Sequence, residues 1–165
     1  MDIARIATHL FSEGSARRCF PNSVLDTIQK AVEAGEARHR GQVCFAIEGA
    51  LSFGELLRGR SARARASEVF ARLHVWDTEH NSGVLIYVLI ADHAIEIVAD
   101  RGIAARVAES EWQDVCAQLR ERFRADDFES GAVAAVEAVS EILARHFPAD
   151  GEPVANELPD RPVRL

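Results

Sequence analysis

The spacing of apolar residues changes repeatedly along the chain, and each change predicts a helix or a strand. Positions three and four apart indicate amphipathic helices, whereas short continuous or alternating apolar runs indicate strands. Helical spacing occurs over residues 3–10, 21–41, 62–73, 112–123 and 132–143, with a loop or short helical turn over 51–59. Ser23 and Asp26 have the spacing of an approximate capping box at the start of the second helix. The pattern therefore predicts five helices.

Three strands are expected between these helices. Val43–Ile47 is a short β-rich run that fits a strand buried on both faces. Val84–Ile90 is continuous and apolar, as in a central strand. The turn Ala91–His93 follows, because Asp tolerates turn geometry. An alternating segment over residues 95–98 then predicts an antiparallel partner strand, and the hairpin ends at Arg101–Gly102.

The order of these elements predicts the fold. The helix between the first two strands permits a right-handed parallel crossover, and the hairpin adds an antiparallel strand. We therefore expect an α/β (α+β) sandwich, in which a small mixed β-sheet is flanked by helices on both faces. Residues 1–19 form an N-terminal helical extension, residues 20–147 the folded domain, and residues 148–165 a flexible tail of prolines and acids.

Length and charge narrow the class of protein. A chain of 165 residues fits a single domain. The net charge of -7 argues against binding to DNA or RNA, which requires a basic surface. The N-terminus lacks the continuous apolar core of a signal peptide, and the longest apolar run, Val84–Ala91, is too short to span a bilayer. We therefore expect a cytoplasmic protein that has no membrane span and does not bind nucleic acid.

The three cysteines agree with a reducing compartment. Cys19, Cys44 and Cys116 are widely separated and odd in number, so they predict neither a disulfide framework nor a zinc site. Cys44 and Cys116 lie in apolar segments and are expected to be buried. Cys19 follows two arginines, which could lower the pKa of its thiol.

Three segments resemble a known family in their order and spacing. They read VLDTIQKAVEAGEARHRGQVCFAIE, then NSGVLIYVLIADHAIEIVADRGI, and then FRADDFESGAVAAVEAV. The first is similar to the opening helix and strand of the TPM domain, the second to its central hairpin, and the third to its acidic motif between Phe and Gly. The resemblance covers the chain from Phe20 to Phe147. This domain is shared by thylakoid lumen proteins, a photosystem II accessory protein and a nematode receptor-associated protein.

The resemblance implies a TPM-like fold and more than one class of function. TPM domains are associated with acid phosphatase activity in a plant member and with divalent-cation binding in some bacterial ones. Others have accessory roles beside membrane complexes. Many members carry a signal peptide or a transmembrane segment, which is not expected here. Ser82 stands where the family often has Asn, and this difference would weaken any polar contact made at that position.

The first candidate site is a set of oxygen ligands at loop ends. If the strands are ordered as in the TPM domain, Asn81, Asp92, Asp126 and Asp127 could approach one another. Carboxylate and amide oxygens suit Ca²⁺ or Mg²⁺, which a phosphatase would use to bind phosphate and activate water. Asn81 and Asp92 flank one strand, whose ends lie about 20 Å apart. The expected groups are therefore Asn81 with Asp126 and Asp127, or Asp92 with His93. Alternatively, Asp92 makes only a turn, and the other two acids only separate two helices.

His93 and Arg101 are the candidate catalytic residues. An imidazole at a turn can transfer protons, and Arg101 near the strand end could bind an anion bidentately. Alternatively, His93 is simply exposed, and Arg101 pairs with Asp100 or Glu96.

Two further polar groups have a structural alternative that we favour. The first group comprises His74, Asp77, Glu79 and His80. These side chains could ligate a transition metal, but a solvated loop is expected, with Trp76 packed against the domain. The arginines from Arg58 to Arg72 could bind phosphate or an acidic partner, but a solvated helix face is expected.

The leading functional hypothesis is a cytoplasmic accessory protein that binds an unidentified protein partner, with Ca²⁺ or Mg²⁺ at the acidic loop ends. The alternative is a metal-dependent phosphatase acting on small phosphomonoesters. None of the motifs GxxxxGK[ST], GxSxG, HExxH or GxGxxG occurs, so no organic cofactor is expected. The sequence leaves the oligomeric state open.

Overall fold

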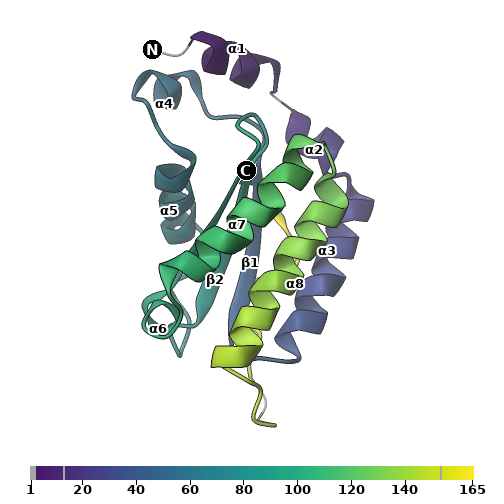
Figure 1. The fold of residues 1–165 in the computed structure, drawn as a ribbon, viewed down its shortest axis with the longest axis vertical. Coiled ribbons are helices and arrows are strands. Elements are labelled where there is room, and N and C mark those ends of the chain that lie inside the picture. The colour runs from purple at the N-terminus through teal and green to yellow at the C-terminus, as the bar shows by residue number, and fades with distance from the viewer. Residues whose placement is uncertain (1–2, 13, 153) are drawn as a thin grey trace.

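The computed structural model describes residues 3–12, 14–152 and 154–165 (Figure 1). Its elements, in chain order, are α1 (Ile3–Phe11), α2 (Ser15–Cys19), α3 (Asn22–Glu36), β1 (Gln42–Glu48), α4 (Phe53–Leu57), α5 (Ala62–Arg72), β2 (Gly83–Leu89), β3 (Ala94–Ala99), α6 (Arg101–Ala104), α7 (Glu109–Arg124), α8 (Phe128–His146) and β4 (Val163–Arg164).

A four-stranded sheet with the order β3-β2-β1-β4 forms the centre of the fold. β1 and β2 are parallel and are connected through α4 and α5, whereas β2 and β3 form an antiparallel hairpin. Helices α3, α7 and α8 lie side by side on one face (Figure 1), and α5 packs on the other. This mixed sheet between helices confirms the predicted fold class.

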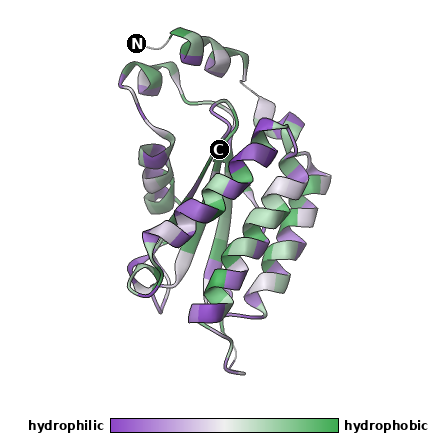
Figure 2. Cartoon of the chain, viewed as in Figure 1, coloured by the Kyte–Doolittle hydropathy of each residue, from purple (hydrophilic) through white to green (hydrophobic). Residues whose placement is uncertain are grey.

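The strands are apolar throughout because both faces of the sheet are buried. Successive side chains of a strand point to opposite faces. Phe45 and Ile47 therefore pack against α3, α7 and α8, whereas Cys44 and Ala46 pack on the side of α5. Figure 2 shows these hydrophobic strands between helices whose hydrophilic residues face outward. The apolar run of β1 is thus explained by packing alone.

The two longest helices, α7 and α8, pack against each other on one face of the sheet. Trp112 and Phe123 of α7 are buried, as are Val136 and Leu143 of α8, at positions that the helical spacing predicts. Among the described residues, no helix combines the length and the apolarity that crossing a membrane requires.

The start of α3 differs from the prediction. Pro21 is its N-cap, and no side chain caps the helix, so Ser23 lies within the first turn instead of preceding it. The predicted capping box of Ser23 and Asp26 is therefore wrong. A capping box occurs at α4 instead, where Ser52 Oγ accepts from the N–H of Glu55 and the Glu55 carboxylate accepts from the N–H of Ser52 at 2.8 Å.

The C-terminal segment is bound along the sheet. β4 pairs in parallel with β1, and the N–H of Leu165 donates to the carbonyl oxygen of Ile47 at 2.9 Å. Leu158 is buried in the core on the side of α5. The expectation of a flexible tail is therefore wrong for residues 154–165. The open edge of β1, which is distant in the sequence, supplies the hydrogen bonds that hold this segment.

Candidate functional site

At the carboxyl end of β2, Asp92 is held by two basic residues of α1. Arg5 donates from Nε to Oδ1 at 3.0 Å and from Nη2 to Oδ2 at 2.7 Å, and Nε2 of His9 lies 2.9 Å from Oδ1. Burial acts to raise the pKa of Asp92, but the hydrogen bonds from Arg5 and His9 outweigh it and lower the pKa. Asp92 thus fastens α1 to the end of the sheet.

His9 has a defined proton position because both ring nitrogens have partners. Its Nδ1 accepts a hydrogen bond from the backbone N–H of Leu51 at 2.9 Å. The neutral ring must therefore carry its proton on Nε2 and donate it to Asp92. The buried His9 side chain links the segment after β1 to the hairpin turn. Asp92 and His93, predicted as one pair of ligands, have different partners.

His93 faces the turn between α7 and α8. Its Nε2 lies 3.9 Å from Oδ1 of Asp126, and both residues adopt a left-handed backbone, with φ of 47° and 58°. The side chain of Asp126 is 77% exposed. Asp127 lies beside Asp126 and is turned toward Arg122, with its Oδ2 3.6 Å from Nη1. The structure therefore brings together His93 and Asp126, a pair that the sequence did not predict.

Asn81 and Arg101 meet at the opposite end of β2. Nε of Arg101 donates to Oδ1 of Asn81 at 3.1 Å. The length of β2, about 20 Å, separates this contact from Asp126. The expected group of Asn81, Asp126 and Asp127 is therefore not formed. In residues 3–12, 14–152 and 154–165, no three His, Cys, Asp or Glu side chains gather as a metal site would require.

The arginine-rich segment contains a buried ion pair. Arg65 of α5 donates to Glu48 through two parallel hydrogen bonds, from Nη2 to Oε1 at 2.8 Å and from Nε to Oε2 at 2.9 Å. Carboxylate oxygens of Glu55 and Glu68 lie 3.3 and 2.9 Å from its Nη1. The expectation of a solvated helix face is therefore wrong for Arg65, which connects α5 to the end of β1.

Tyr87 completes this buried network. Its hydroxyl donates to Oε2 of Glu48 at 2.5 Å. Burial, together with the carboxylate of Glu48, raises the pKa of Tyr87, and the hydrogen bond to Glu48 raises the pKa of Arg65. The phenol therefore stays neutral and the guanidinium stays charged. Sequence reasoning missed Glu48 and Tyr87, although polar side chains in otherwise apolar strands were a usable signal.

The three thiols are free and are poorly reactive near neutral pH. Arg18 acts to lower the pKa of Cys19, as two preceding arginines could, but burial outweighs it and raises the pKa, which agrees with the interpretation of Cys19 as an unreactive thiol. Burial also raises the pKa of Cys44 to about 12 and that of Cys116 to about 11.

Val75 anchors the loop before β2. Its side chain is fully buried, and a Cβ added at Gly83 would lie 1.9 Å from its carbonyl oxygen. Trp76 remains 44% exposed, with its ring centroid 5.9 Å from that of His74. The expectation that Trp76 packs against the domain is wrong, because the neighbouring Val75 supplies the buried side chain of this loop.

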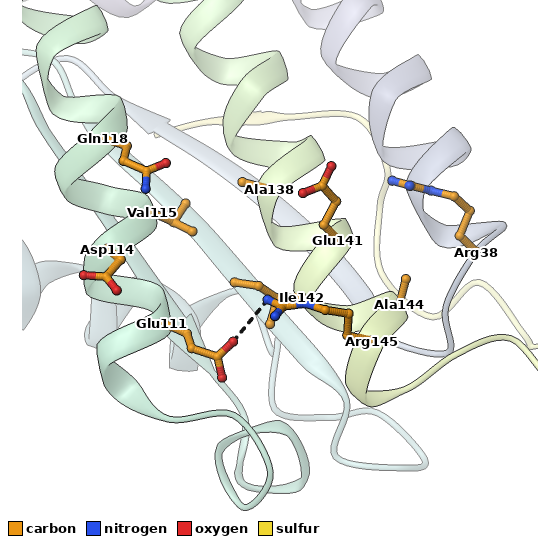
Figure 3. A pocket seen from close by; sticks show the side chains of 10 residues that line it. All are labelled: Arg38, Glu111, Asp114, Val115, Gln118, Ala138, Glu141, Ile142, Ala144 and Arg145. Atoms are coloured by element: carbon orange, nitrogen blue, oxygen red, sulfur yellow. Dashed lines mark hydrogen bonds and ion pairs between the residues drawn. The ribbon is translucent and has the colours of Figure 1, made fainter.

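Two surface hollows were not predicted from the sequence. A groove of about 530 Å³ lies between α7 and α8 (Figure 3). Its apolar lining comes from Val115, Ala138, Ala144 and Ile142, and its polar lining from Arg38, Glu111, Asp114, Gln118, Glu141 and Arg145. Arg145 reaches across one end, where its Nη2 lies 3.2 Å from Oε2 of Glu111.

The second hollow, of about 500 Å³, lies at the amino end of β2 and is called the amino-end pocket below. Its basic side chains are Arg40, His80, Arg106 and His146. They come from four segments that are far apart in the sequence, so no local motif marked this pocket.

Comparisons with known proteins agree with this architecture. The sequence model of the TPM domain matches residues 18–142. Among solved structures, the chain is similar to the BA42 protein of the psychrophilic bacterium Bizionia argentinensis, with a TM-score of 0.73 and 25% identity over 87% of this chain and 93% of that one. The search of curated proteins found no match. The family match covers most of the chain, and the chain therefore belongs to the TPM domain family.

Proposed function

We propose that this TPM-domain protein is an accessory protein that binds a partner protein through the groove between α7 and α8. The observation that supports this role is the apolar floor of the groove beneath a charged rim (Figure 3). Val115 and Ile142 supply that floor from two neighbouring helices. A groove between two helices can accept the apolar face of a third one.

The rim carries three carboxylates against the two guanidinium groups of Arg38 and Arg145, and this excess of negative charge favours a basic partner. Asp114 on α7 and Glu141 on α8 line the groove, and no ion pair involves either of them within the described segments. The chain as a whole carries a net charge of -7. Charge complementarity speeds association and disfavours acidic partners. We therefore assign the groove to an amphipathic helix of the partner that carries Lys or Arg beside its apolar stripe.

The cytoplasm is the proposed compartment for this interaction. All three cysteines are free, and Cys44 and Cys116 are buried. Unpaired cysteines are typical of proteins kept in a reducing environment.

Reversing the charge of the rim is expected to weaken binding of a basic helix. The probe is a labelled synthetic amphipathic peptide with Lys on one face and Leu on the other, measured by fluorescence anisotropy. The double variant Asp114→Lys/Glu141→Lys should raise its Kd by roughly tenfold or more, since two attractions become repulsions.

The matched control is Glu129→Lys/Glu137→Lys, which makes the same change in net charge on the exposed part of α8 outside the groove. This control should change the Kd by less than about twofold at physiological ionic strength. Equal weakening by both double variants would contradict the groove, because net charge alone would then explain the binding.

A divalent cation at the turn between β2 and β3 is a second proposal. It is supported by a single exposed carboxylate, that of Asp126, so water molecules would supply the remaining oxygen ligands that Ca²⁺ and Mg²⁺ prefer. Millimolar Ca²⁺ or Mg²⁺ should raise the melting temperature of the wild-type protein by roughly 3–5 °C at ten times the Kd. Asp126→Asn should remove this increase, whereas the exposed Asp77→Asn should keep it. A shift that survives Asp126→Asn would refute this location.

The alternative, a metal-dependent phosphatase, requires the cation and the phosphate ligand in one site. Arg101, the proposed phosphate ligand, lies at the end of β2 opposite to Asp92, so these two residues cannot act on the same phosphate. A chromogenic phosphomonoester, assayed with Mg²⁺, Ca²⁺ and Mn²⁺, separates the two functions. The accessory role predicts no hydrolysis, and hydrolysis that is lost in Asp126→Asn would favour the phosphatase.

A further inference from the structure

The amino-end pocket is lined by basic side chains, although the protein as a whole is acidic. Two guanidinium groups, of Arg40 and Arg106, and two imidazoles, of His80 and His146, line it, and its lining includes no carboxylate. Ser82 also lines the pocket, and its hydroxyl has no hydrogen-bond partner among the described residues. Nε2 of His146 already lies 3.5 Å from Oε1 of Glu111, so Arg106 and His80 are the basic side chains of the pocket that no carboxylate pairs with among the described residues. Both can donate hydrogen bonds, so the pocket suits an anion.

The segments that form the pocket are joined by backbone hydrogen bonds. The N–H of Arg40 donates to the carbonyl oxygen of Phe147 at 2.9 Å, and the N–H of Gln42 donates to that of Ser82 at 3.0 Å. The N–H of Gly102 donates to the carbonyl oxygen of Asn81 at 3.1 Å. The basic side chains therefore stand on a fixed frame, which lowers the entropic cost of binding a ligand.

The two arginines of the pocket differ in their ion-pair partners. Arg40 forms an ion pair with Asp150, from the segment that follows α8. Arg106 lies over the ring of Phe147, with Cζ 4.9 Å from its centroid, and no carboxylate pairs with it in the part of the chain that the structure describes. Arg40 therefore already binds a carboxylate of the protein itself. Arg106 is positioned on an aromatic face and has no carboxylate partner among the described residues.

We infer that the amino-end pocket binds a small dicarboxylate, with one carboxylate on Arg106 and the other on Arg40 in place of Asp150. The ion pair with Asp150 shows that the guanidinium of Arg40 can bind a carboxylate. A planar carboxylate can accept two parallel hydrogen bonds from one guanidinium group. The volume of about 500 Å³ is sufficient for a small organic acid. This site is separate from the groove and does not depend on the role proposed for it.

Succinate is the probe that tests this inference, with acetate and inorganic phosphate as comparison anions at constant ionic strength. Isothermal titration calorimetry should give a Kd for succinate that is roughly tenfold lower than that for acetate, because a second charge-assisted contact is made. Arg106→Gln should raise the succinate Kd to the acetate level. Asp150→Asn should lower the succinate Kd, because Arg40 is then released from its internal partner.

The matched control is Arg72→Gln, which removes an exposed arginine of α5 that does not line the pocket. It should leave the succinate Kd within about twofold of wild type. Equal affinities for succinate and acetate, tighter binding of phosphate, or equal weakening by Arg72→Gln and Arg106→Gln would each overturn the inference. Unchanged melting temperatures of the variants ensure that lost binding reflects the pocket and not unfolding.

Discussion

Replacing Arg65 with methionine is expected to lower the free energy of unfolding by about 3–5 kcal/mol. The substitution leaves the carboxylate of Glu48 buried at the end of β1 without the two hydrogen bonds that Arg65 donates to it. Tyr87 continues to donate one hydrogen bond, but a neutral phenol does not neutralise the charge. Urea unfolding followed by circular dichroism would measure the loss.

Two further variants separate charge burial from lost packing. Arg72→Met changes an exposed arginine of the same helix and should alter stability by less than about 0.5 kcal/mol. The triple variant Glu48→Leu/Arg65→Met/Tyr87→Phe removes the whole polar network and should recover much of the stability lost in Arg65→Met. If the triple variant is as unstable as Arg65→Met, the loss arises from the methylene packing of Arg65 and not from an uncompensated charge.

The pH dependence of stability should reveal two groups at the junction of α3 and β1 with opposite effects. Burial raises the pKa of Glu36 to about 7 and lowers the pKa of His39 to about 4. Glu36 therefore reduces stability as pH rises from about 4.5 to 7, because the folded state holds a proton that the unfolded state has lost. His39 reduces stability as pH falls from about 6.5 to 4, because the unfolded state takes up a proton that the folded state excludes.

Single substitutions should expose these two trends, which largely cancel in the wild-type protein. Relative to wild type, Glu36→Gln should gain stability as pH rises from 4.5 to 7, whereas His39→Asn should gain stability as pH falls from 6.5 to 4. Each change should reach about 3 kcal/mol over its full range. Both variants keep a local hydrogen bond, since Gln can still accept from the N–H of Val43 and Asn can still donate to the carbonyl oxygen of Gly41.

The double variant Glu36→Gln/His39→Asn provides the control, because it removes both titrating groups. Chemical unfolding at a series of pH values gives all four curves. Differences from wild type that stay constant with pH in both single variants would contradict the assigned pKa shifts.

The candidate site was much less accessible from the sequence than the fold. Apolar spacing was sufficient to predict β1, β2, β3 and the main helices, because each of these elements buries a face with its own period. The partners of the polar residues could not be predicted in this way. Asp92 binds Arg5 and His9, which precede it by more than eighty positions. Asp126, in the turn between α7 and α8, approaches His93 in the turn of the hairpin.

The prediction of a flexible C-terminal tail was wrong for a similar reason, because the open edge of β1 that binds this segment is distant in the sequence. Prolines and acids in the last residues indicated a flexible tail, yet Leu158 is buried and Leu165 donates a hydrogen bond to Ile47. Two residues of strand carry too little local pattern to be predicted, and their stability comes from the strand that they meet.

The sequence by itself determined the family, the mixed sheet between helices and the burial of Cys44 and Cys116, because these depend on local periodicity and on ordered motifs. The tertiary structure alone decided which charges meet. It placed Arg65 on Glu48 inside the molecule, separated Asn81 from Asp126 by the length of a strand, and gathered Arg40 and Arg106 around one pocket. Hydrogen bonds and ion pairs depend on distances of a few ångströms in space, whereas apolar periodicity is a property of the sequence itself.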